Sequence, residues 1–180
     1  RILKDGKTSF VSRVTLGGVE VVIKRYNHKG LLHAIRHTIK GSRARRSWLN
    51  ANRLALLGIP TPRPLAYIEE RRAVLLCCSY FITEFIDAQG LHSILADKNV
   101  PKDRKRQLID QVVNLIDRLA SQGISHGDTK HTNILYNGRD VVLTDLDAMR
   151  TSRMAWLCRH RHQRDLDRCL RDLTDTGVTS

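Results

Sequence analysis

The first third of the chain consists of short runs in which apolar and polar residues alternate, separated by turn residues. Arg1–Leu3 and Phe10–Thr15 fit strands on either side of a turn at Lys4–Ser9. A second turn, Leu16–Gly18, leads into another alternating run at Val19–Lys24. Alternation with a period of two is typical of half-buried strands, and glycine between two runs is typical of hairpin turns. The pattern therefore predicts a three-stranded meander.

The apolar positions then take on helical spacing. Leu31, Ile35 and Ile39 recur every four residues, which predicts a basic helix. A stronger helix is predicted at Ser42–Leu57, because Gly58 stands at its end and three prolines follow. Beyond the prolines, we expect two more strands around a charged turn. The strands are Leu65–Glu69 and Ala73–Phe85, and the turn is Glu70–Arg72.

The second half of the chain has mainly helical patterns. After a linker at Ala88–Gly90, a short helix is predicted at Leu91–Ala96. The longest helix is predicted at Pro101–Gln122, since proline suits a first turn and Gly123 a stop. It has a wide apolar face, which predicts burial. A last helix is predicted at Gln163–Leu173.

Together these elements predict an α+β fold with two lobes in one domain of 180 residues. We expect residues 1–86 to form a β-rich N-lobe, an antiparallel sheet with one main helix. Residues 87–180 are expected to form a short, mostly helical C-lobe.

The positive charge is concentrated in the first third of the chain. Residues 1–53 hold 13 Lys/Arg and two acids, whereas residues 54–150 hold 12 of each sign, and the whole chain carries +13. This imbalance predicts an anionic partner, such as nucleotide phosphates, a glycolipid or a membrane surface. Nucleic acid is a weaker expectation, because only 5% of the residues are aromatic and able to stack on bases.

The cysteines and the apolar runs indicate where the protein works. Four cysteines, two of them adjacent, lack metal-ligand spacing, so we expect reduced thiols. No apolar run approaches the ~20 residues that span a bilayer, and no signal-peptide core stands at the start. We therefore expect a cytoplasmic protein.

One polar run and one later acid carry the candidate chemistry. The run is His126–Asn133, and Asp145 follows it after a predicted hairpin, Ile134–Leu143. This order brings Asp128, Lys130, Asn133 and Asp145 around one small volume. Hard oxygen ligands and an ammonium group are what a magnesium-dependent phosphotransferase needs, and a carboxylate is needed to orient the attacking hydroxyl. The pattern predicts a kinase. Asp147 has two interpretations, support of the metal site or a cap of the next segment.

These motifs resemble those of the protein-kinase-like fold. The run His126–Asn133 is similar to a kinase catalytic loop, Thr144–Asp147 stands where kinases carry Asp-Phe-Gly, and Val21–Lys24 looks like the lysine-bearing strand. More narrowly, the chain resembles the bacterial lipopolysaccharide kinases that phosphorylate Kdo or heptose of the inner core. Three segments carry this narrower resemblance: Ile23–Tyr26, Arg43–Arg46 with Gly58–Pro64, and Asp145–Asp147.

The resemblance implies roles for the candidate residues. Asp128 would orient the substrate hydroxyl, Lys130 would meet the transferring phosphoryl group, and Asn133 and Asp145 would hold Mg²⁺. Further residues would bind ATP: Lys24 its phosphates, the turn at Gly6 a phosphate, and the backbone of Glu84 and Ile86 the adenine. Asp165 would anchor the catalytic loop through its backbone, or would form a surface charge pair.

One departure from the family pattern leaves alternatives open. Kinases pair the strand lysine with a helix glutamate, but no Asp or Glu occurs between Glu20 and Glu69, and Ser47 or Asn50 stands where the acid is expected. Either Lys24 pairs directly with Asp145 and the nucleotide phosphates, or activity is reduced, and a catalytically silent nucleotide-binding pseudokinase is then the alternative. The His-Gly-Asp start at 126–128 leaves a further alternative, an atypical (RIO-like) protein serine/threonine kinase.

The expected acceptor is a sugar of the lipopolysaccharide core or another anionic glycolipid. No activation segment follows Asp147, which disfavours a peptide acceptor. The basic residues of the first third predict peripheral contact with anionic inner-membrane lipid. They are Lys29, Arg36, Lys40, Arg43, Arg45, Arg46 and Arg53. An ordinary solvated helical face is the other interpretation of the same residues.

Overall fold

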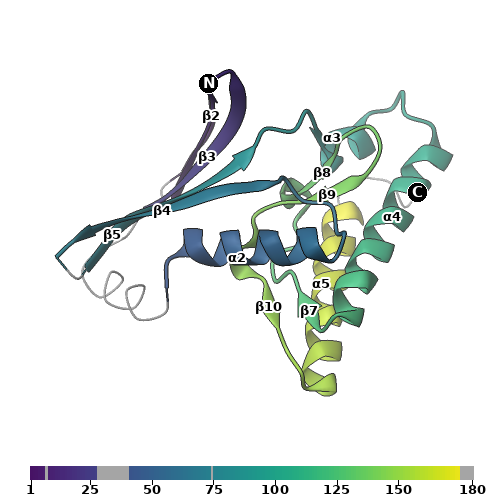
Figure 1. The fold of residues 1–180 in the computed structure, drawn as a ribbon. Coiled ribbons are helices and arrows are strands. Elements are labelled where there is room, and N and C mark those ends of the chain that lie inside the picture. Colours follow the sequence, from purple (N-terminus) through teal and green to yellow (C-terminus); the bar gives the residue numbers. More distant parts are fainter. Residues whose placement is uncertain (7, 28–40, 74, 175–180) are drawn as a thin grey trace. The chain divides into compact units, whose positions relative to one another are not determined.

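The structure, a computed structural model, describes residues 1–6, 8–27, 41–73 and 75–174. Of these, residues 172–174 are described by their backbone alone. The helix predicted through Leu31 and Ile39 lies outside the described residues, as do Lys29, Arg36 and Lys40. The chain divides into two compact units. Unit 1 comprises Arg1–Gly58 and Pro62–Ile86, and unit 2 comprises Ile59–Thr61 and Asp87–Ser180. The fold is α+β, with an antiparallel sheet in unit 1 and a mostly helical unit 2, as the sequence predicts (Figure 1).

Unit 1 is built on one five-stranded antiparallel sheet of order β1-β2-β3-β5-β4. The predicted meander is confirmed, because its three strands pair in sequence order. Its glycine turn is confirmed too: Gly17 and Gly18 both have positive φ. The strands are β1 (Ile2–Asp5), β2 (Ser9–Leu16), β3 (Val19–Asn27), β4 (Pro64–Arg72) and β5 (Leu75–Glu84).

Helix α2 (Arg43–Leu56) packs on this sheet against β3, β4 and β5. The Ser42 hydroxyl caps its start by accepting from the Arg45 backbone N–H at 2.9 Å, and Gly58 ends it with φ 63°. Its buried face is made mostly of small side chains, which allow a close approach to the sheet. In that interface the Ser47 hydroxyl lies 2.9 Å from the Tyr26 hydroxyl of β3.

The predicted turn at Glu70–Arg72 is wrong. These residues continue β4, with Arg71 opposite Leu76 and Arg72 opposite Leu75, and the chain turns after them at Ala73, where φ is 51°. The physical reason is the position of β4 at the edge of the sheet, where charged side chains reach solvent without leaving the strand.

Unit 2 combines helices with two small antiparallel sheets, one of order β6-β8-β9 and one that pairs β10 with β7. The longest predicted helix is confirmed as α4, which buries a continuous apolar face and stops at Gly123, with φ 67°. The other elements are β6 (Gln89–Gly90), α3 (Leu91–Ala96), β7 (Ile124–Ser125), η1 (His131–Asn133), β8 (Ile134–Tyr136), β9 (Val141–Leu143), η2 (Leu146–Ala148) and β10 (Arg150–Thr151), with α4 at Lys102–Ser121 and α5 at Ala155–Thr174.

Helix α5 begins at Ala155, well before the predicted start at Gln163. Its first turns lack apolar periodicity, because the partly buried positions include the polar Cys158 and His162. His162 faces α4, where its Nε2 lies 3.2 Å from an oxygen of Asp117. The four cysteines are free thiols. Among the helices that the structure describes, none is long and apolar enough to cross a membrane.

Candidate active site

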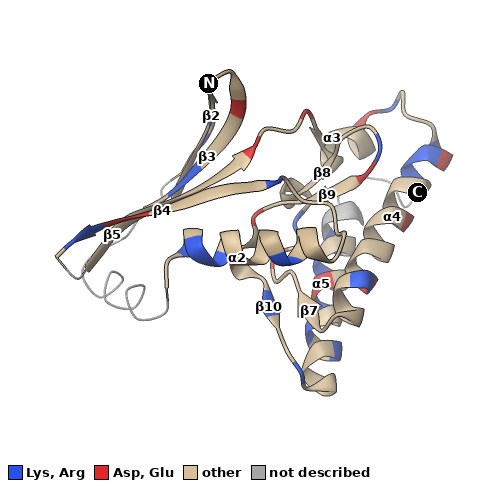
Figure 2. Cartoon of the chain, in the orientation of Figure 1, with Lys and Arg blue, Asp and Glu red and all other residues tan. Residues whose placement is uncertain are grey.

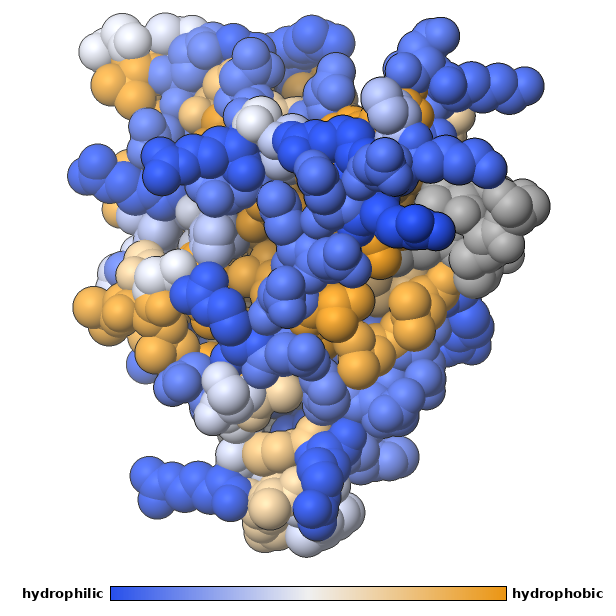
Figure 3. All heavy atoms as spheres, turned by 90° about the vertical axis from the view of Figure 1, so that its right-hand side faces the viewer, coloured by the Kyte–Doolittle hydropathy of each residue, from blue (hydrophilic) through white to orange (hydrophobic). Residues whose placement is uncertain are grey.

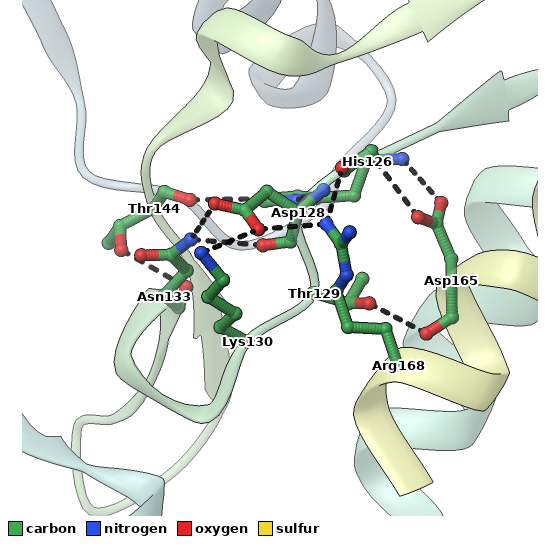
Figure 4. A network of polar contacts seen from close by, with 9 residues as sticks. His126, Asp128, Thr129, Lys130, Asn133, Thr144, Asp165 and Arg168 are labelled. Atoms are coloured by element: carbon green, nitrogen blue, oxygen red, sulfur yellow. Dashed lines mark hydrogen bonds and ion pairs between the residues drawn. The ribbon is translucent and has the colours of Figure 1, made fainter. Parts of the chain in front are cut away.

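The run His126–Asn133 forms a loop between β7 and β8 that is fixed by residues of α5, seen at the right of Figure 4. The buried carboxylate of Asp165 accepts from two successive backbone amides, His126 N at 2.7 Å and Gly127 N at 2.9 Å. The Asp165 backbone carbonyl accepts from the Thr129 hydroxyl at 2.6 Å. Of the two interpretations of Asp165, the structure shows the loop anchor.

Close packing of the loop against the η2 segment requires glycine at position 127. Its φ is 80°, and a Cβ placed there would lie 2.8 Å from the backbone oxygen of Ala148. A side chain at this position would have to displace backbone of the η2 segment. Glycine therefore lets the loop and the segment after Asp145 lie against each other.

His126 is fully buried and links the loop to the strand that precedes Asp145. Its Nδ1 accepts from the Asp128 backbone N–H at 3.3 Å, so Nε2 carries the proton and donates to the Thr144 carbonyl at 3.0 Å. Burial lowers the pKa of His126 below its ordinary 6.5, although the nearby carboxylates of Asp165, Asp145 and Asp128 act in the opposite direction. The ring is a neutral structural link.

Asp128 has separate partners for its two carboxylate oxygens. Oδ1 accepts from Arg168 Nη1 at 2.9 Å and lies 3.4 Å from Lys130 Nζ. Oδ2 accepts from the Asn133 side-chain amide at 3.1 Å. Two cations on one oxygen and a neutral donor on the other hold this side chain, which is 26% exposed, in a fixed orientation.

The Asn133 amide is oriented by acceptors. Its Nδ2 donates to the Asp128 backbone carbonyl at 2.9 Å as well as to Oδ2 of the same residue. Both partners only accept, so the NH₂ group must face Asp128 and Oδ1 must face away from it. Within the described part of the chain, no hydrogen bond to Asn133 Oδ1 is formed.

Asp145 stands beside Asn133 because Thr144 is bound to the Asn133 backbone. The carbonyl of Asn133 accepts from both the N–H of Thr144, at 2.9 Å, and its hydroxyl, at 3.0 Å. Asp145 itself has φ 60° and ψ 54°, a left-handed conformation that is costly for a residue with a side chain. Such strain is common where a side chain must be aimed at a functional site. The structure thus brings Asp128, Lys130, Asn133 and Asp145 to one place in unit 2.

A comparison with protein-family models identifies the chain. Residues 4–180 match the model described as "Lipopolysaccharide kinase (Kdo/WaaP) family". The chain belongs to the lipopolysaccharide kinase (Kdo/WaaP) family. Members of this family are kinases, so the enzyme class and the use of ATP that the sequence predicts are confirmed.

A solved structure supports the fold of this lipopolysaccharide kinase. The chain is similar to the structure titled "WaaP in complex with acyl carrier protein", with a TM-score of 0.73 and 19% sequence identity. The match covers 99% of this chain and 73% of the other. At this level of identity the likeness establishes the protein-kinase-like fold.

The residues predicted to bind the nucleotide lie in unit 1. Lys24 is near the middle of β3, with Nζ 5.1 Å from the Tyr26 ring centroid. Gly6 forms the turn between β1 and β2, where its N–H donates to the Ser9 carbonyl at 3.1 Å. Glu84 ends β5, and its N–H donates to the Arg63 carbonyl at 3.0 Å. Ile86, two residues on, is the last residue of the unit.

Arg168 of α5 is the residue of this lipopolysaccharide kinase site that sequence reasoning missed. Its Nη1 donates to the Gly127 carbonyl at 3.0 Å as well as to Asp128. It stands three residues after Asp165, and residues three apart share one face of a helix. The three-residue spacing from Asp165 could have pointed to Arg168, but only if Asp165 was already known to face the loop.

Proposed function

We propose that this kinase transfers phosphate from ATP, with Mg²⁺, to a sugar hydroxyl of the lipopolysaccharide inner core, on Kdo or heptose. The observation that carries the proposal is the Asp128 carboxylate, oriented by Arg168, Lys130 and Asn133 in a loop of a lipopolysaccharide kinase family member. We propose further that residues 1–86 act as the nucleotide-binding lobe and residues 87–180 as the catalytic lobe.

Asp128 is proposed to orient the acceptor hydroxyl and receive its proton. Oδ1 is occupied by Arg168 and Lys130, and Oδ2 accepts one hydrogen bond from Asn133. A carboxylate oxygen can accept two, so Oδ2 is the atom with room for the hydroxyl. A weak base suffices, since the proton leaves late in a loose phosphoryl-transfer transition state. Lys130, whose side chain is 56% exposed, is proposed to stabilise negative charge on the transferring group.

The donor set of this site fits Mg²⁺. The Asn133 amide turns its oxygen away from Asp128, and Thr144 holds the backbone before Asp145 against Asn133. An amide oxygen and a carboxylate are both hard ligands. Asn133 and Asp145 would hold the ion, and the ion would neutralise charge on the nucleotide phosphates when bound.

In unit 1, Lys24 is proposed to bind the nucleotide phosphates and the turn at Gly6 to lie over them. The adenine would use the backbone near the end of β5. Because the Glu84 N–H already donates to Arg63, the Glu84 carbonyl and the Ile86 N–H are the groups proposed for this contact. Tyr26 and Ser47 provide the link between β3 and α2 in place of an ion pair.

The enzyme is proposed to act in the cytoplasm, peripheral to the inner membrane, where a lipid-linked core acceptor would be available. The test is to incubate the protein with Mg-ATP and core glycolipid and to look for a phosphorylated product by mass spectrometry. Autophosphorylation and a generic protein acceptor are assayed in parallel, and transfer only to protein would favour the RIO-like alternative.

Asp128→Asn is the matched variant for this assay. It preserves the size of the side chain and the contact with Asn133, but it removes the proton acceptor. We expect transfer to fall by a factor of roughly 10² to 10⁴, in the range typical of general bases, with an unchanged folded state by circular dichroism. Full turnover by this variant would refute the assignment.

A further inference from the structure

The first turns of α5 and the segment leading into them form a basic tip with an apolar centre. We define this basic tip as residues 150–164, which contain no Asp or Glu. In its centre Met154 is 58% exposed and Trp156 is 63% exposed. Its five arginines are Arg150, Arg153, Arg159, Arg161 and Arg164. Figure 2 shows blue and no red ribbon at this lower end of α5, and Figure 3 shows pale and tan side chains there between blue ones.

The charge of the basic tip is not neutralised by any carboxylate among the residues that the structure describes. Among the described residues, none of its five arginines has a carboxylate partner, whereas Arg13 pairs with Glu20 at 2.5 Å and Arg168 with Asp128 at 2.9 Å. The acid that meets this stretch is Asp117 of α4, and it pairs with His162 on the inner side. The positive charge is therefore available to an external anion.

The exposed apolar residues sit on a well-fixed backbone. Ser152 N–H donates to the Gly123 carbonyl at 2.8 Å, and the Ser152 carbonyl accepts from the Cys158 thiol at 3.2 Å. A Cβ at Gly123 would lie 2.6 Å from the Ser152 oxygen, so the α4–β7 turn and the basic tip are in close contact. Met154 and Trp156 are thus held outward by ordered structure.

We propose that the basic tip docks on the anionic surface of a phospholipid bilayer. This inference rests on the peripheral location in the proposed function and names the surface that would bind the membrane. Tryptophan favours the headgroup region, and arginines around it attract anionic lipid. An apolar centre of two large side chains is small for a stable protein interface, which covers about 800 Å² per partner. It suffices to enter a membrane interface when charge adds to the binding.

Vesicle sedimentation tests the docking. The full chain is mixed with phosphatidylcholine vesicles, or with the same vesicles containing phosphatidylglycerol, at low and high salt. We expect binding to the anionic vesicles alone, weakened by salt. Arg159→Gln is expected to weaken it about fivefold, whereas the control Arg106→Gln, at an exposed position of α4, should not change it. Equal binding to both vesicle types would refute the proposal. Binding to neither would also refute it, and would point instead to an acidic protein partner.

Trp156 provides a direct readout of the contact. The chain has two tryptophans, and Trp48→Phe leaves Trp156 as the sole emitter. We expect a blue shift of its emission with anionic vesicles and quenching by brominated lipid. Trp156→Ala should reduce binding, whereas Leu56→Ala, at a residue of α2 that is 89% exposed, should not. Sedimentation without any change in Trp156 emission would show that another surface binds.

A kinase assay separates this surface from the proposed function. Variants of the basic tip should keep full transfer to a water-soluble, deacylated core oligosaccharide and lose transfer to the vesicle-embedded glycolipid. If wild type phosphorylates both acceptors but binds no vesicle, the docking surface is refuted and the function stands. If wild type binds anionic vesicles through Trp156 but phosphorylates neither acceptor, the function is refuted and the surface stands.

Discussion

At the residue scale, Asp128 and Arg168 form the contact that joins α5 to the proposed catalytic base. Arg168 Nη1 bridges the Gly127 carbonyl and Asp128 Oδ1, so one guanidinium fixes both the backbone and the side chain of the proposed base. The pair is partly exposed, with side-chain exposures of 36% and 26%. Its contribution to global stability is therefore small, about 0–1 kcal/mol, and its main effect should be on orientation.

For Arg168→Gln, we expect turnover to fall roughly tenfold to a hundredfold, the value of a hydrogen bond to a charged group. The KM for ATP and the midpoint of urea unfolding should change little, because the contact does not involve unit 1 or the core. Arg168→Lys should restore part of the rate. Arg164→Gln, one turn earlier and exposed, is the control, with turnover measured on the water-soluble, deacylated acceptor so that the basic tip does not contribute. A parallel loss in the control would mean that net charge, not orientation, matters.

His126 predicts a specific pH dependence of folding. Its pKa in the folded state is lowered below 6.5 by burial, so the unfolded chain binds more protons as the pH falls. The contribution of His126 is therefore complete above pH 6.5 and is lost as the pH falls from there through the folded-state pKa. The slope from one such group is at most about 1.4 kcal/mol per pH unit.

The measurement is the free energy of unfolding by urea between pH 7.5 and 5, a range chosen to bracket the ordinary pKa of about 6.5 for histidine. We expect His126→Gln to be less stable at neutral pH and to lose less stability than wild type on acidification. His160→Gln, at an exposed position of α5, should follow the wild-type slope. An unchanged slope in His126→Gln would contradict the buried neutral histidine.

At the element scale, α5 supports the loop from one face. Asp165 accepts from two backbone amides of the loop, and the His126 amide would otherwise remain buried without a partner. Asp165→Ala should cost roughly 1–3 kcal/mol, the penalty for the one buried donor that loses its partner. Asp167→Ala is the exposed control on the same helix, for which we expect a change within about 0.5 kcal/mol.

Urea unfolding measures that cost, and amide hydrogen exchange locates it. Exchange of the His126 and Gly127 amides should accelerate in Asp165→Ala at pH and denaturant conditions where the core of α4 remains protected. Acceleration throughout unit 2 to the same degree would mean that Asp165 stabilises the whole unit rather than the loop.

The elements also show which features can be predicted from sequence. Ser42, Gly58 and Gly123 mark helix ends through local chemistry, so the bounds of α2 and α4 were predictable within a residue or so. The end of β4 was not predictable, because consecutive charged residues in an edge strand resemble the sequence of a turn. The start of α5 was missed because the partly buried positions of its first turns hold one aliphatic residue, Leu157, beside Cys158, Arg161 and His162. Nor was the Arg168 contact predictable, since it joins positions 40 residues apart.

At the scale of the whole molecule, we propose that unit 1 binds the nucleotide and unit 2 carries out phosphoryl transfer. The usual acidic partner of the strand lysine cannot come from α2, which has no Asp or Glu. In its place the buried Ser47 and Tyr26 hydroxyls join α2 to β3. Lys24 lies two residues before Tyr26, with its Nζ near the same ring. The Tyr26–Ser47 hydrogen bond therefore links α2 to β3 without an acidic side chain on the helix.

If Lys24 binds the nucleotide phosphates, Lys24→Met should weaken Mg-ATP binding and transfer by at least tenfold, the effect of a lost charge-assisted contact of about 1.5–3 kcal/mol. Arg25→Met, the exposed neighbour on the other face of β3, removes the same charge and should retain both activities. Isothermal titration measures binding and the glycolipid assay measures transfer, with circular dichroism confirming the fold. Wild type that stays folded, binds Mg-ATP and transfers no phosphate would support the pseudokinase alternative. Wild type that binds no nucleotide would contradict the roles of Lys24, Glu84 and Ile86 together.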